Sequence, residues 1–129
     1  KIPKMKKEDL QSHLYSLIIP KEILLFFDIE NIKESEEIVE IYLLEKEIIP
    51  PELTGKQAVL NGFMNPIELQ SFPIQGRKCY LKLKRRRWKA QGTTDSTKCH
   101  NVYDFAAEGT KATKMFGTFL KENGFKISF

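Results

Sequence analysis

Residues 77–89 alternate apolar and basic side chains, and this stretch constrains the fold more than any other part of the sequence. Successive side chains of a β-strand point to opposite faces, so Cys79, Leu81 and Leu83 would share a face that must meet a core. The opposite face would carry cations and two aromatic rings: Lys78, Tyr80, Lys82, Lys84, Arg86 and Trp88. The pattern predicts one long strand over residues 77–89, buried on one side and basic on the other.

The end of this strand carries three consecutive arginines, Arg85, Arg86 and Arg87. Alternation places Arg85 and Arg87 on the face that begins with Cys79. Burying unpaired cations costs several kcal/mol. We therefore expect the strand to leave the core by about Arg85 and to continue as a protruding ribbon with both faces in solvent.

The rest of the chain predicts a single α+β domain over residues 1–129, with an acidic half (1–70) and a basic half (71–129). An antiparallel sheet would carry the long basic β-hairpin, and N-terminal helices and a C-terminal helix would pack on it. Hydrophobic periodicity predicts helices over residues 6–18, just after Pro20 and over 110–123, the last of them capped by Thr110 or Gly109. Alternating residues between Gly, Pro and turn residues predict a hairpin over 27–44 and strands over 58–60 and 66–72. A return strand over 101–106 would pair with the basic strand.

Charge is divided unevenly between the two halves. Residues 1–70 hold 8 lysines against 13 acidic residues, a net charge of −5, and residues 71–129 hold 13 basic against 4 acidic residues, a net charge of +9. Clustered cations displace counterions from a nucleic-acid backbone, and exposed aromatic rings stack on bases. The predicted DNA-binding residues are Arg77, Lys78, Tyr80, Lys82, Lys84, Arg85, Arg86, Arg87, Trp88 and Lys89, joined by Lys111 and Lys114 at the start of the last helix.

Three alternatives compete with DNA binding. The cations could simply form the solvent-exposed face of an edge strand, where they discourage aggregation, or they could pair with the acidic strand over residues 36–47. The chain could be a protein-interaction module that docks a catalytic partner through the acidic hairpin and the apolar tail, residues 125–129. It could also be a small hydrolase or nuclease that uses Asp104, Glu108 or His100.

Metal and cofactor sites are not expected. Cys79, Cys99, His13 and His100 are the only soft ligands, and no Cys-x-x-Cys pair is present. Cys79 is predicted to be a buried free thiol. No phosphate-binding glycine motif and no nucleophile motif occurs, so we expect no catalytic residues and no cofactor. The sequence has no apolar run long enough to span a bilayer and no signal peptide, so we expect a cytoplasmic protein.

The basic strand resembles a stretch in the N-terminal region of a family of bacterial insertion-sequence transposases. The similar residues are 72–81 (FPIQGRKCYL), running into 84–88 (KRRRW). Residues 108–114 with the helix after them, and residues 18–24 with the acidic hairpin, are also similar. Together they cover most of residues 15–123.

In that family a short protein precedes a separate DDE catalytic part. The resemblance implies recognition of transposon-end DNA, or support of the catalytic subunit, by a chain that is not itself the catalyst. Related transposases carry a zinc ribbon with paired Cys-x-x-Cys knuckles before a basic strand. This chain lacks the knuckles, which implies that ordinary hairpin packing replaces the metal.

Overall fold

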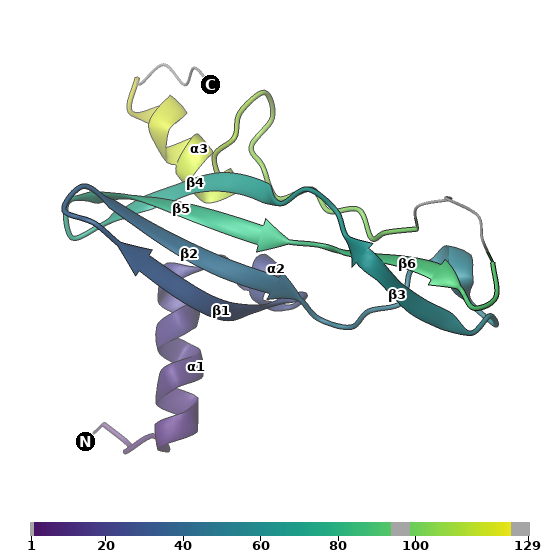
Figure 1. Ribbon diagram of the computed structural model, residues 1–129. Coiled ribbons are helices and arrows are strands. Elements are labelled where there is room, and N and C mark those ends of the chain that lie inside the picture. The colour runs from purple at the N-terminus through teal and green to yellow at the C-terminus, as the bar shows by residue number, and fades with distance from the viewer. Residues whose placement is uncertain (1, 94–98, 125–129) are drawn as a thin grey trace.

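The computed structural model describes residues 2–93 and 99–124 of the chain. It has the predicted α+β architecture, with a four-stranded sheet, a two-stranded sheet and three helices (Figure 1). The apolar tail, residues 125–129, lies outside the described residues. The helices and strands run in the order α1 (Lys7–Ile18), α2 (Lys21–Leu24), β1 (Phe27–Glu34), β2 (Ile38–Glu45), β3 (Ala58–Phe63), β4 (Ile67–Ile74), β5 (Arg77–Lys84), β6 (Arg86–Ala90) and α3 (Lys114–Glu122), with a 3₁₀ turn over Pro51–Leu53.

The four-stranded sheet has the order β1-β2-β5-β4. β1 and β2 form an antiparallel hairpin, and so do β4 and β5, whose turn at Gln75 and Gly76 has positive φ at both residues. The two central strands, β2 and β5, are parallel, which departs from the expected all-antiparallel sheet. The reason is that the chain leaves β2 to form β3 and returns along β4, so β5 enters the sheet in the direction of β2.

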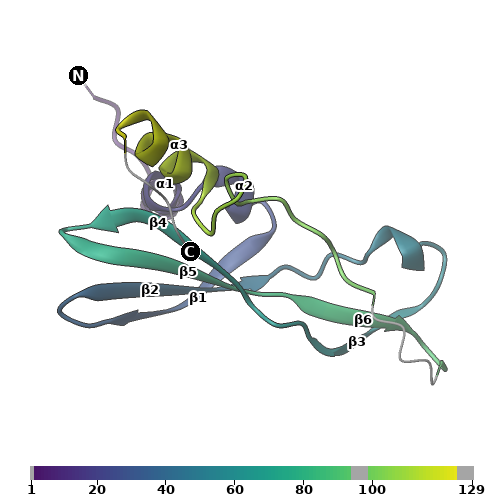
Figure 2. The ribbon, with the colours of Figure 1, turned by 90° about the horizontal axis from the view of Figure 1, so that it is seen from above.

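The predicted alternation in β5 is confirmed, and it sets the core. Cys79, Leu81 and Leu83 are fully buried and pair in register with Val39, Ile41 and Leu43 of β2. The aromatic and aliphatic side chains that cover this face come from α2, from the start of β1 and from the segment after residue 100, and include Ile23, Phe27 and Phe105. Figure 2 shows all three helices on one side of the four-stranded sheet, so the other face is not covered by a helix.

The basic strand leaves the four-stranded sheet at Arg85, near the predicted point, but it is interrupted there and does not continue as the one long strand predicted over residues 77–89. β5 ends at Lys84, and β6 pairs with β3 as a separate two-stranded sheet that extends from one end of the molecule (Figure 1). We call this two-stranded sheet the ribbon. The predicted pairing partner is wrong, because residues 101–106 form no strand and β3 takes that place. Tyr103 and Phe105 instead stack on each other, 5.1 Å between ring centroids, and pack against Phe27.

The two longer helices also differ from expectation. α1 has the predicted length, but none of its residues is buried, and it projects away from the sheet instead of packing on it (Figure 1). α3 begins four residues later than predicted. Its N-cap is Thr113, whose hydroxyl accepts a hydrogen bond from the Phe116 backbone, and neither Thr110 nor Gly109 caps it. Residues 110–113 are not helical because they bond to β4, where the Gln70 backbone N–H donates to the Lys111 carbonyl.

A close approach at Gly117 fixes how α3 sits on the molecule. A Cβ added there would lie 2.4 Å from Cβ of Ala107. We expect Gly117→Ala to lower the free energy of unfolding by about 1–3 kcal/mol through overpacking, although alanine is the better helix former. Thermal unfolding measures this, with Thr118→Ala on the exposed side of α3 as the control. A Gly117→Ala protein as stable as the wild type would contradict this packing.

Candidate nucleic-acid interface

Two of the four cations of β5 are paired with carboxylates of neighbouring strands. Arg77 forms an ion pair with Glu34 at 3.0 Å, and Lys82 lies 3.1 Å from both Glu40 and Glu68. The hydrogen bond that Lys82 donates to Glu68 is the largest cause of a raised pKa at Lys82. The alternative of pairing with the acidic strand over residues 36–47 is therefore confirmed for Lys82, through Glu40, whereas the partner of Arg77 lies in β1.

The cations from the end of β5 onward are in a different situation. Lys84, Arg85, Arg86, Arg87 and Lys89 form no ion pair within 4.0 Å among the residues that the structure describes. The facing strand β3 contains no acidic residue. Residues 84–89, which we call the basic segment, thus carry five positive charges with no carboxylate paired to them in the described part of the chain.

The three arginines are hydrogen-bonded to backbone carbonyls rather than to acids. Arg85 Nη2 donates to the Asn65 carbonyl at 2.8 Å, Arg86 Nε to the Glu45 carbonyl at 2.8 Å, and Arg87 Nε to the Asn61 carbonyl at 2.6 Å. A carbonyl satisfies a donor and leaves the full positive charge in place. These bonds fix the Arg87 guanidinium to β3, the Arg86 guanidinium to the end of β2 and the Arg85 guanidinium to the segment between β3 and β4.

This arrangement corrects the expected arm with both faces in solvent. All three arginines are half-buried. The Arg87 guanidinium packs on Gly62, where an added Cβ would lie 3.1 Å from Nη2. Arg87 therefore holds the two strands of the ribbon together as well as carrying charge, and Arg85 and Arg86 tie the start of β6 to the segments beside it.

A buried carboxylate at the junction of the two sheets was missed in the sequence. Glu45 is 1% exposed, and its carboxylate accepts hydrogen bonds from the Arg86 backbone N–H at 2.8 Å, from Asn101 Nδ2 at 3.2 Å and from the Tyr103 hydroxyl. Burial, and then the hydrogen bond to Glu45, raises the pKa of Tyr103. A signal was present, since Glu45 continues the inward positions of Val39, Ile41 and Leu43 in β2.

Trp88 is not placed as predicted. It is 7% exposed, because the chain at Cys99 runs along the free edge of β6 and exchanges two backbone hydrogen bonds with it, of 2.8 and 3.3 Å. With β3 on its other edge, β6 is a central strand at this point. The expectation that the Trp88 ring is offered to a base is therefore wrong, and Trp88 belongs to the packing of the ribbon.

The other predicted contact residues lie away from the basic segment. Lys78 is exposed at the start of β5, and Tyr80 is half-buried on the sheet face that no helix covers. Lys111 is exposed beside β4, and Lys114 lies 3.5 Å from Asp104. Figure 1 shows α3 over the four-stranded sheet and β6 at the far end of the molecule, so the structure does not bring these two lysines to the basic segment.

The three residues considered for hydrolysis do not line one pocket together. Asp104 and Glu108 line a shallow pocket together with Lys114 and Lys121, and His100 is not among its lining residues. Within the described ranges, no group of three or more His, Cys, Asp and Glu side chains is arranged to hold a metal ion. Cys79 is a buried free cysteine, as predicted, and burial raises the pKa of its thiol to about 11.

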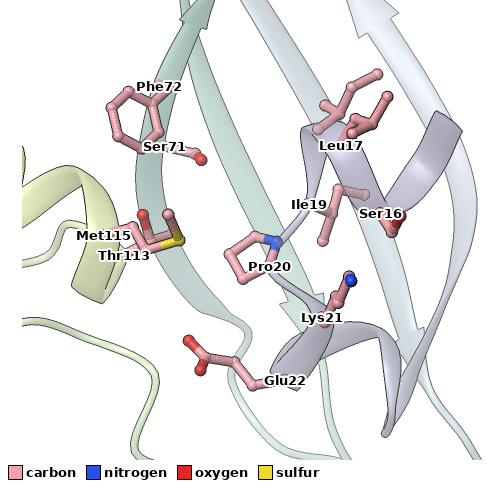
Figure 3. Close-up of a pocket in the computed structure, with 11 residues that line it drawn as sticks. Ser16, Leu17, Ile19, Pro20, Lys21, Glu22, Ser71, Phe72, Thr113 and Met115 are labelled. Carbon is pink, nitrogen blue, oxygen red and sulfur yellow. The ribbon is translucent and has the colours of Figure 1, made fainter. Parts of the chain in front are cut away.

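An apolar hollow lies on the helical side of the sheet, away from the ribbon. Its volume is about 470 Å³. Figure 3 shows Leu17, Ile19 and Pro20 on one side of it, and Phe72 and Met115 on the other. None of the predicted DNA-binding residues lines it.

Comparison with protein-family models, with curated proteins and with solved structures found no match to this chain. In the described part of the chain, no helix has the length and apolar character needed to cross a membrane.

The role of the arginine bonds can be tested by unfolding. Arg87→Ala removes the bond to the Asn61 carbonyl and the packing on Gly62, and we expect it to lower the free energy of unfolding by about 1–3 kcal/mol. Lys89→Ala, two residues along the same strand, should change it by less than about 0.5 kcal/mol. Urea unfolding of both variants measures the difference. Equal stability of the two would show that Arg87 does not hold the ribbon.

Proposed function

We propose that this protein binds a nucleic acid through the basic segment, residues 84–89. The observation that carries the proposal is the contrast along one basic strand. Arg77 and Lys82 are paired with acids, whereas the five cations after them have no acidic partner in the described structure. Unpaired, closely spaced cations repel one another, and a polyanion stabilises them while its own counterions are released.

The way the arginines are held supports a phosphate ligand. Arg86 and Arg87 bond to carbonyls through Nε, a bond that does not involve their terminal Nη groups, and Arg87 Nη2 packs on Gly62. A guanidinium keeps its charge in these bonds and presents several donors in one plane, which suits phosphate oxygens. Because each guanidinium is already fixed, less side-chain entropy is lost when a phosphate binds.

The resemblance to the N-terminal region of insertion-sequence transposases gives the nucleic acid a proposed identity. It supports DNA at the ends of a mobile element as the ligand, and a separate DDE transposase subunit as the protein partner. In this proposal the chain is a non-catalytic component that binds the element's ends. Comparing a duplex of the element's terminal repeat with a random duplex tests this finer assignment, and equal affinity for both would contradict it.

The binding itself is tested by the salt dependence of affinity. Lys84→Gln combined with Lys89→Gln removes two charges that make no described hydrogen bond to the fold. We expect the slope of log K against log salt on duplex DNA to become shallower by about 1.8, at about 0.9 per phosphate contact.

Lys7→Gln combined with Lys21→Gln is the matched control, because it removes the same net charge from α1 and α2. The control should keep the wild-type slope. An unchanged slope in the Lys84→Gln and Lys89→Gln protein, or an equal change in the control, would contradict binding at the basic segment.

A further inference from the structure

The face of the four-stranded sheet that no helix covers carries a row of aromatic and basic side chains leading to the basic segment. Tyr80, Lys82 and Lys84 are successive residues of β5 on this face, because Cys79, Leu81 and Leu83 point into the core. Tyr42 of β2 is the register partner of Lys82. Lys84 Nζ lies 4.3 Å from the centre of the Phe63 ring, which brings the ribbon into the same row.

Three aromatic rings therefore lie at three positions along the basic strand, those of residues 80, 82 and 86. Tyr80 is on the strand itself, Tyr42 stands beside Lys82, and Phe63, which lies under the Lys84 ammonium, is the register partner of Arg86. Residues two apart in a strand are separated by about 6.6 Å. A nucleotide in a duplex advances by only about 3.4 Å along its strand, so the spacing of the rings suits an extended strand whose bases are not stacked on each other.

From this row we infer that the nucleic acid bound by the basic segment is single-stranded, with bases stacked on Phe63, Tyr42 and Tyr80. The inference rests on the proposed function and names the form of its ligand. Phe63 is 39% exposed, and both tyrosines are half-buried, so part of each side chain is open to solvent. Stacking on such rings is tolerant of sequence because every base has a flat face.

The charges on this face favour an arrangement in which the bases lie over the four-stranded sheet and the phosphates lie over the basic segment. Glu40 and Glu68 lie on the sheet part of the row, where Lys82 between them offsets only one of their two charges. Phosphates would be repelled there, whereas uncharged bases would not. Lysines already lie over two of the rings, Lys33 over Tyr42 at 5.2 Å and Lys84 over Phe63, and both can turn to a phosphate when a base takes their place.

Fluorescence anisotropy with a labelled oligothymidylate and with a labelled duplex, at one salt concentration, tests the inference. The wild type should bind the single strand more tightly than the duplex. Tyr80→Leu and Phe63→Leu should each weaken single-strand binding by about 5-fold or more. Tyr80→Phe keeps the ring and should bind like the wild type, as should Tyr15→Leu, which removes an exposed tyrosine from α1.

Thermal unfolding of each variant separates loss of stacking from loss of folding, and Tyr42→Leu provides a third ring should one variant not fold. Folded ring variants that bind the single strand like the wild type would overturn the inference, as would a preference for duplex. If the ring variants have no effect while Lys84→Gln with Lys89→Gln still weakens duplex binding, only the single-strand inference fails. If the wild type binds neither polymer, the proposed function fails with it.

Discussion

The parallel pairing of β2 with β5 determines how charge is distributed over this molecule. It places the acidic hairpin beside the first half of the basic strand, where Glu40 meets Lys82 and Glu34 meets Arg77. The same register aligns the apolar positions of both strands into one core face. Because β2 ends at Glu45, the acidic strand runs out where β5 gives way to β6, and the cations beyond that point have β3 as their partner strand instead.

The junction at Glu45 allows two sheets to share one basic strand. A buried carboxylate is costly unless its oxygens accept several hydrogen bonds. Here the backbone of Arg86 and the side chains of Asn101 and Tyr103 supply them. The cluster ties the start of β6, the end of β2 and the segment after residue 100 together, so the ribbon leaves the body of the protein at a fixed place.

Local patterns in the sequence were sufficient for the features that depend on one strand. Alternation located the buried face of β5, and the cost of burying arginine predicted that the chain leaves the core near Arg85. Features that depend on distant pairing were not accessible in this way. The segment over residues 101–106 has the alternating pattern of a strand, yet Tyr103 and Phe105 pack in the core. Trp88 is buried beside a chain segment at Cys99, and the residues next to Trp88 in the sequence do not indicate that contact. The candidate site was predicted in part. The predicted site covered the whole basic strand, whereas the candidate site is restricted to residues 84–89, because Arg77 and Lys82 are paired with acids.

The central claim is that the cations of the basic segment, which have no acidic partner in the described structure, meet the nucleic acid. Lysine-selective labelling with and without bound DNA, followed by mass spectrometry, tests this at every lysine in one experiment. The account predicts strong protection of Lys84 and Lys89, and unchanged labelling of Lys21, Lys111 and Lys114. Protection centred on Lys111 and Lys114, or spread evenly over the lysines of the chain, would contradict it.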